Sequence, residues 1–205
     1  MVETRIFSVL LLLFPFLLTT VFANGKHEEE QQPTADIEKF LKENPKMWVY
    51  NTTEPSNITC RLDVYANVTV NSTSFSRYFV DNTREEKKLN LTGNFLDWQG
   101  GVPPLPGKFD AMEINYREQP MEYPLGYDVY EFQSDQGECA VVSVLDNSAE
   151  LTATWLDLRV SDSAIEREPA KECKDQFERI LRIYPPTKRV SRISYQEDCK
   201  PSSNK

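Results

Sequence analysis

A long stretch in which apolar and polar side chains alternate constrains the fold of this chain more than any other feature. It runs from residue 57 to residue 70. The apolar set is Ile58, Cys60, Leu62, Val64, Ala66, Val68 and Val70, and the polar set is Asn57, Thr59, Arg61, Asp63, Tyr65, Asn67 and Thr69. A period of two is typical of a β-strand with one buried face. We therefore expect a strand whose apolar set faces the core and whose polar set faces water.

Further strand-like segments follow at short intervals, and turn-forming residues separate them. The expected strands cover residues 75–80, 109–117, 127–133, 139–145 and 151–160, and an earlier one begins at Met47. The longest turn region, residues 97–107, holds a Gly-Gly pair and three prolines. Short strands at regular spacing, with the prolines kept between them, predict an antiparallel sandwich or barrel.

Two helices are expected, one on each side of the strand region. Asp36 is a suitable N-cap for a short helix that ends before Pro45. A longer helix is expected from Pro169, a residue type favoured at the first helical position. Its apolar side chains are spaced for a single stripe, which includes Cys173 and Phe177. We expect this amphipathic helix to pack against the outside of the sheet.

The first residues have the pattern of a secretory signal peptide. Arg5 precedes an apolar run at residues 6–18, and the small residue Ala23 stands at the expected cleavage site. We therefore expect a secreted, extracellular protein. The expected division of the chain is a signal peptide at 1–23, a disordered acidic leader at 24–35, one domain at 36–199 and a flexible tail at 200–205.

Two other counts agree with export. The four cysteines make an even number, as two disulfides require, and four cysteines allow three pairings. Five sequons for N-glycosylation lie close together, at Asn51, Asn57, Asn67, Asn71 and Asn90. We expect a glycoprotein in which at least one of these asparagines carries no glycan.

The charge of the chain excludes several classes of function. With 23 Lys and Arg against 32 Asp and Glu, the net charge is −9 and the pI is about 4.8. Such a chain lacks the basic surface that nucleic acid or an anionic membrane requires. Its one histidine, His27, lies in the polar leader, so neither a histidine-based metal site nor histidine-based catalysis is expected. We expect no enzyme activity, no metal and no cofactor.

The sequence resembles the salivary lipocalins of ticks, the histamine-binding family. The segments that carry the resemblance are Trp48-Val49-Tyr50-Asn51, Cys139-Ala140-Val141-Val142, Leu158-Arg159-Val160-Ser161-Asp162 and Cys173-Lys174-Asp175-Gln176-Phe177. The resemblance implies a mainly β fold: an eight-stranded antiparallel up-and-down barrel with a short N-terminal helix and one C-terminal α-helix packed outside. It also implies disulfides Cys60–Cys199 and Cys139–Cys173. The first of these raises a question, because the alternation places Cys60 on the inward face of its strand.

The ligand-binding strand of the family corresponds here to residues 155–160. The resemblance assigns Asp157 to the position of an amine-binding glutamate, and Arg159 stands where the family has a tryptophan. Trp155, two residues before Asp157, is placed to supply the aromatic face instead. Arg159 has two other uses, either pairing with Asp157 or holding the carboxylate of an anionic amphiphile. Further candidates for the cavity on other strands are Glu113, Asp128, Tyr130, Glu131 and Phe132.

Three functions follow from these observations. The first is a secreted lipocalin that sequesters a small host mediator, a biogenic amine such as histamine or serotonin, as the resemblance to tick salivary proteins of immune evasion implies. The second keeps the barrel but carries an eicosanoid, a fatty acid or a sterol. The third is a surface inhibitor of a host complement or haemostasis protein. In each case we expect a monomer without nucleic acid or membrane partners.

Overall fold

The structure is a computed structural model that describes residues 35–98, 108–119, 122–149, 152–183 and 190–200. These residues belong to one compact unit of the chain, residues 32–205. The expected signal peptide and nearly all of the expected leader lie outside the described residues. No helix among the described residues is long and apolar enough to span a bilayer.

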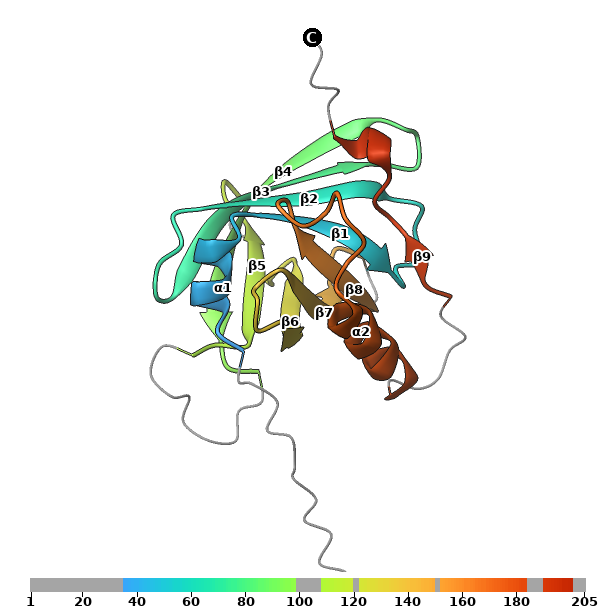
Figure 1. The fold of residues 1–205 in the computed structure, drawn as a ribbon. Coiled ribbons are helices and arrows are strands. Elements are labelled where there is room, and N and C mark those ends of the chain that lie inside the picture. The colour runs from blue at the N-terminus through green and yellow to red at the C-terminus, as the bar shows by residue number, and fades with distance from the viewer. Residues whose placement is uncertain (1–34, 99–107, 120–121, 150–151, 184–189, 201–205) are drawn as a thin grey trace, which may run out of the picture. The chain divides into compact units, whose positions relative to one another are not determined.

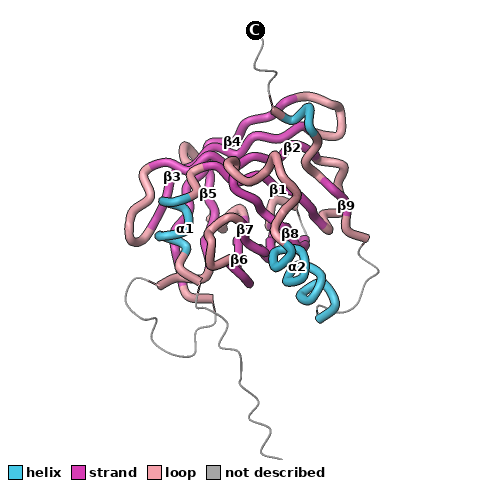
Figure 2. Tube along the Cα trace, viewed as in Figure 1, coloured by secondary structure: helices cyan, strands magenta, loops and turns pink. Residues whose placement is uncertain are grey.

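Eight antiparallel strands form a closed barrel (Figures 1 and 2). The strands are β1 (Lys46–Thr52), β2 (Thr59–Ala66), β3 (Ser72–Val80), β4 (Glu86–Leu96), β5 (Ala111–Tyr116), β6 (Gly126–Gln133), β7 (Cys139–Asp146) and β8 (Ala153–Ser161). Each strand pairs with the next along the chain, and β1 closes the barrel by pairing with both β2 and β8. The expected up-and-down barrel is confirmed.

The C-terminal segment lies against the outside of the barrel beside β1. A two-residue strand, β9 (Arg192–Ile193), pairs with Asn51 and Thr52 at the end of β1. The other end of β1 pairs with β2 instead, so the tail covers the edge that β1 leaves open. A short 3-10 helix, η1 (Glu197–Cys199), follows β9. Neither element was expected from the sequence, since a two-residue strand has no detectable period.

Both expected helices are present. In α1 (Ile37–Glu43) the Asp36 carboxylate accepts a hydrogen bond from the backbone N–H of Lys39 at 3.1 Å, as an N-cap should. The second helix, α2 (Lys171–Ile183), begins two residues later than Pro169 predicted. It buries Cys173, Phe177 and Ile180 against the outer face of β7 and β8, which confirms the expected packing.

One strand was missed by the sequence analysis. The interior side chains of β4 are Leu91, Gly93 and Phe95, and they alternate with polar residues. The period-two signal was present, but charged residues occupy the first three positions of the strand and obscure it. An added Cβ at Gly93 would lie 2.1 Å from the Met112 sulfur, so glycine permits the close approach of β5 there.

The two faces of β2 are opposite to the prediction. Arg61, Asp63 and Tyr65 are buried inside the barrel, whereas Cys60 and Leu62 lie outside, against the apolar cluster beneath the C-terminal segment and α2. The alternation itself is real. The inversion has two physical causes. The C-terminal segment covers the outer face of β2, so apolar side chains are buried there. Ion pairs inside the barrel stabilise the charged side chains of the inner face of β2.

Both disulfides implied by the resemblance are present. Cys60–Cys199 and Cys139–Cys173 have Cα–Cα distances of 5.0 and 6.2 Å. Because Cys60 lies on the outer face, at a bulge where its φ is 53°, the tail reaches it from outside. The Asp198 carboxylate lies close enough to the sulfurs of Cys60 and Cys199 for the three to hold a metal ion, but the two sulfurs are bonded to each other as a disulfide.

Candidate ligand-binding site inside the barrel

The three residues assigned to the binding strand lie together on β8. Trp155, Asp157 and Arg159 alternate along the strand and are all buried. Asp157 lies opposite Val142 and Arg159 opposite Ala140 on β7, two residues of the apolar cluster inside the barrel. The side chains between them point the other way, toward α2. The structure therefore brings all three candidates to the barrel interior.

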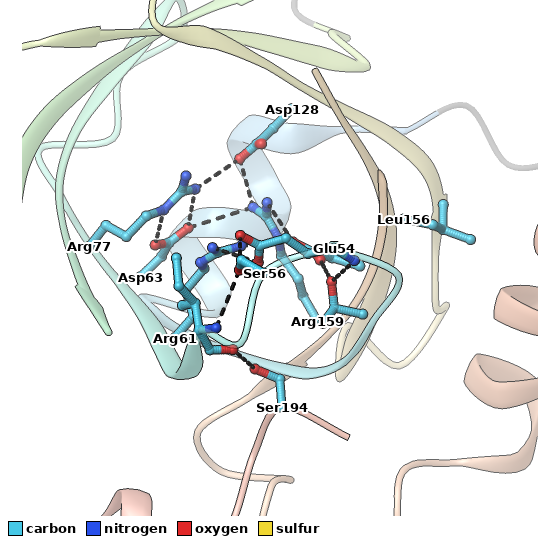
Figure 3. A network of polar contacts seen from close by, with 12 residues as sticks. Glu54, Ser56, Arg61, Asp63, Arg77, Asp128, Leu156, Arg159 and Ser194 are labelled. Carbon is cyan, nitrogen blue, oxygen red and sulfur yellow. Dashed lines mark hydrogen bonds and ion pairs between the residues drawn. The ribbon is translucent and has the colours of Figure 1, made fainter. Parts of the chain in front are cut away.

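Arg159 is held by carboxylates on three different strands (Figure 3). Its Nη1 lies 2.7 Å from Asp128 Oδ2 and 3.6 Å from Asp63 Oδ2, and its Nη2 lies 3.5 Å from Asp157 Oδ2. Burial disfavours the cation, yet the surrounding negative charges, with Asp128 first, raise the pKa of Arg159 well above its ordinary value. Arg159 therefore pairs with Asp157, as one hypothesis held, but Asp128 is its main partner.

A second guanidinium, that of Arg77, completes this part of the network. Its Nε and Nη2 contact the two oxygens of Asp63, each at 2.8 Å, across the β2–β3 register. Its Nη2 also lies 3.2 Å from Asp128 Oδ2. Burial raises the pKa of Asp63, but Arg77 outweighs it and holds that pKa below its ordinary value. The geometry is the bidentate one in which arginine binds carboxylates most strongly.

A third guanidinium, that of Arg61, lies between Asp157 and the rim. Its Nη2 contacts Glu54 Oε2 at 2.8 Å, and its Nη1 is 3.8 Å from Asp157 Oδ2. Its Cζ lies 5.8 Å from the centre of the Trp155 ring, within the range of a cation–π contact. On the other side of Asp157, Thr52 donates a hydrogen bond to Oδ1 at 2.6 Å.

The network is balanced in charge, but its contacts are uneven at Asp157. Four carboxylates, those of Glu54, Asp63, Asp128 and Asp157, are matched by four guanidiniums: Arg61, Arg77 and Arg159 form ion pairs with them, and Arg192 interacts with Glu54 and Asp157. The nearest guanidinium nitrogens to Asp157 Oδ2 are 3.5 and 3.8 Å away, whereas Asp63 and Asp128 each have one at 2.8 Å or less. Burial raises the pKa of Asp157 above its ordinary value, although Arg159, Arg61 and the Thr52 hydroxyl oppose this shift.

Five buried polar atoms inside the barrel have no hydrogen-bond partner among the described residues. They are Asp128 Oδ1, the indole Nε1 of Trp155, the Tyr130 hydroxyl and the Nε atoms of Arg61 and Arg159. Buried polar atoms are nearly always paired in folded proteins, so an acceptor and a donor without partners mark a place where a ligand can bind. Tyr130 also faces this interior, where burial raises its pKa to about 12.

The structure does not bring Phe132 or Glu113 to this group. Phe132 follows the bulge in β6 and packs against the outer apolar cluster. Glu113 lies on β5 between Met112 and Ile114, which belong to the inner apolar cluster, so its own side chain points outward. There it accepts a hydrogen bond from Asn115 at 3.0 Å. The expectation that Glu113 faces the cavity is therefore corrected.

Sequence reasoning missed four members of the network: Glu54, Arg61, Asp63 and Arg77. Two of them lie on the β2 face that was expected to be wet. The signal that could have found the pair between β2 and β3 is complementary charge, because Asp63 and Arg77 are opposite each other across the hairpin. No comparable signal exists for Glu54, which lies in the β1–β2 connection.

The structure ranks the five sequons by exposure. Four are exposed, at Asn57, Asn67, Asn71 and Asn90. Asn51 is half-buried, lies in β1 between β8 and β9, and has a buried Oδ1. We predict that Asn51 carries no glycan, because a glycan there would compete with the strands on both sides. Partial enzymatic deglycosylation should give at most four steps on a gel, and Asn51→Gln should leave them unchanged. Loss of one step in that variant would contradict the prediction.

Comparison with known proteins gives structural likeness alone. No family model and no curated protein sequence matches this chain. The chain is similar in structure to insecticyanin from the tobacco hornworm Manduca sexta, at 12% identity and a TM-score of 0.55, over 83% of this chain and 88% of that one. The siderocalin Ex-FABP is similar at 10% identity and a TM-score of 0.54, over 75% of this chain and 94% of that one. AM182, in its complex with serotonin, is similar at 17% identity and a TM-score of 0.51, over 80% of this chain and 91% of that one. With its closed eight-stranded antiparallel barrel and a helix packed outside, the chain has the lipocalin fold.

Proposed function

We propose that this protein is a secreted lipocalin that binds a small molecule with one positive charge, a biogenic amine such as histamine or serotonin, inside its barrel. The observation that carries the proposal is the buried Asp157 carboxylate, whose Oδ2 has no guanidinium nitrogen closer than 3.5 Å among the described residues. Close pairing is what offsets the cost of burying a carboxylate, which is several kcal/mol. The ammonium of a small monocation can approach Asp157 more closely than either guanidinium does.

The surroundings of Asp157 suit an ammonium group. Its carboxylate is buried and fixed by Thr52, and the Trp155 ring lies nearby to supply a cation–π contact. The unpaired indole N–H of Trp155 and the free oxygen of Asp128 offer further hydrogen bonds to a polar ligand. The resemblance to tick histamine-binding proteins supports the same ligand class, as does the likeness in fold to a serotonin complex.

An anionic lipid fits the network less well. Its carboxylate needs a free cation, and Arg159 was the candidate for that role. Arg61, Arg77 and Arg159 are each held by at least one carboxylate at 2.8 Å or less. A fatty acid would therefore have to displace an existing ion pair. Arg192, at the rim, donates to the backbone carbonyls of Ser56 and Ile58.

Native mass spectrometry of the delipidated, secreted protein tests the proposal. The ligand panel is histamine, serotonin, arachidonate, a leukotriene and cholesterol. We expect a one-to-one adduct with an amine and none with the lipids. An adduct with the lipids alone would overturn the proposal in favour of a lipid carrier. The absence of any adduct would also overturn it and would favour a function of the outer surface.

The affinity for a cation should depend on pH through Asp157. Because burial raises the pKa of Asp157, the carboxylate takes up a proton at a higher pH than its ordinary value of 3.8. In the free protein this contribution to stability is largest below 3.8 and is lost as the pH rises through the raised value. Binding of a cation has the opposite dependence, since it needs the ionised form.

We therefore predict that affinity falls as the pH falls through the raised pKa of Asp157. Calorimetric titration with a quaternary ammonium analogue of serotonin measures this dependence without titration of the ligand's own amine. Asp157→Asn should remove the pH dependence along with most of the affinity. A constant affinity of the unaltered protein down to pH 4 would contradict the role of Asp157.

A further inference from the structure

The Arg61 side chain makes the contacts with Asp157 and Trp155 that the proposed function assigns to a ligand amine. It is buried, it lies against the Asp157 carboxylate, and its guanidinium lies over the Trp155 ring. A carboxylate on one side of a cation and an aromatic ring on another are the two contacts expected of a ligand ammonium. Here a residue of the chain itself makes both contacts.

The contacts of Arg61 are unequal. The guanidinium forms an ion pair with Glu54 at 2.8 Å but is 3.8 Å from Asp157. Its Nε is buried and has no hydrogen-bond partner among the described residues. Arg61 can therefore leave Asp157 and keep its stronger partner, Glu54. The cost of that movement is smaller than the cost of displacing Arg159, whose Nη1 contacts Asp128 at 2.7 Å.

The backbone around Arg61 and Glu54 connects both residues to Asp157. Arg61 lies at the β2 bulge, next to Cys60, and Glu54 lies in the connection between β1 and β2. The backbone N–H of Glu54 donates to the Thr52 hydroxyl at 3.0 Å, and that hydroxyl donates to Asp157. The connection that holds Arg61 is thus linked by hydrogen bonds to the same carboxylate.

We propose that Arg61 is the specificity-determining residue of the barrel: its guanidinium competes with a ligand ammonium for Asp157 and Trp155, and binding requires its withdrawal toward Glu54. This inference rests on the proposed function. A ligand binds only to the extent that it interacts with Asp157 and Trp155 more favourably than Arg61 does. Ligands that carry no positive charge, or that are too bulky to take the place of the guanidinium, are therefore rejected. Apparent affinity is reduced by the fraction of molecules in which Arg61 occupies the site.

Calorimetric titration of histamine into three proteins tests the competition. Arg61→Gln should bind histamine about tenfold more tightly than the unaltered protein, because the internal competitor is gone. The variant also removes one positive charge, so Glu54→Gln/Arg61→Gln, which leaves the net charge unchanged, should keep a gain in affinity. Arg179→Gln, on the exposed face of α2, is the control for a change in net charge and should leave the affinity unchanged.

A second measurement tests whether the two cations share one position. Ethylguanidinium, which reproduces the end of the arginine side chain, should raise the Tm of Arg61→Ala and leave that of the unaltered protein unchanged. Histamine should compete with it in that variant. Simultaneous binding of both would overturn the shared position, as would the absence of any ethylguanidinium effect on the Tm of Arg61→Ala.

The outcomes separate the two proposals. If the unaltered protein binds histamine and Arg61→Gln binds it no more tightly, the competition is wrong and the amine function stands. If no variant binds histamine or serotonin, both proposals fail. A gain in Arg61→Gln that disappears in Glu54→Gln/Arg61→Gln would assign the effect to net charge and would overturn the competition by occupancy.

Discussion

Asp157→Asn is expected to weaken amine binding by a factor of roughly 30 or more. Removing one partner of a buried charge pair costs about 2–5 kcal/mol of binding free energy, and 1.4 kcal/mol is about a tenfold change in the dissociation constant. The substitution keeps the shape of the side chain and its acceptor for the Thr52 hydroxyl. It removes the negative charge that the ligand ammonium requires.

Calorimetric titration with histamine or serotonin measures this loss. The fold should survive, because burial raises the pKa of Asp157 and the neutral side chain is therefore tolerated in the folded protein. Asp175→Asn, which removes an exposed carboxylate paired with Lys171 on α2, is the matched control and should bind normally. Equal affinities of Asp157→Asn and the unaltered protein would place the amine elsewhere.

Asp128→Asn is expected to lower the free energy of unfolding by about 3–5 kcal/mol, the cost of breaking a buried ion pair by removing one partner. Asp128 is fully buried on β6, and its Oδ2 contacts Arg159 at 2.7 Å and Arg77 at 3.2 Å. Without its charge, two guanidiniums in the barrel would share the remaining carboxylates.

Urea denaturation followed by tryptophan fluorescence measures the change. Glu178→Gln, at an exposed position in the middle of α2, should alter the unfolding free energy by less than about 0.5 kcal/mol, as is usual for surface substitutions. A loss below about 1 kcal/mol in Asp128→Asn would mean that the network does not stabilise the barrel.

The sequence predicted the architecture better than it predicted which side chains face the interior. Period-two alternation located β2, although the strand covers Thr59–Ala66 and not the whole of 57–70. Alternation cannot say which of two faces is inside when both are covered. In a barrel the outer face of β2 is usually wet, but here the C-terminal segment packs on it through Cys60–Cys199. The alternation therefore predicts that the apolar residues face the interior and that Arg61 and Asp63 face water, whereas the structure buries both charged residues.

The sequence predicted the part of the site that lies on one strand and missed the part that comes from other strands. Trp155, Asp157 and Arg159 share a face of one strand, and a local pattern is enough to place them together. The partners of Arg159 come from β2 and β6, far away in the chain, and only the closure of the barrel brings Asp63 and Asp128 to it. Such contacts depend on the register of distant strands, which one sequence does not reveal.

The measurement that tests the account most directly is a crystal structure of the protein with serotonin bound. The account predicts that the ligand ammonium lies within about 4 Å of the Asp157 carboxylate, the usual limit for an ion pair, and over the face of Trp155. Arg61 should then contact Glu54 and no longer Asp157. Serotonin bound outside the barrel, or inside it with Arg61 still against Asp157 and Trp155, would contradict the account.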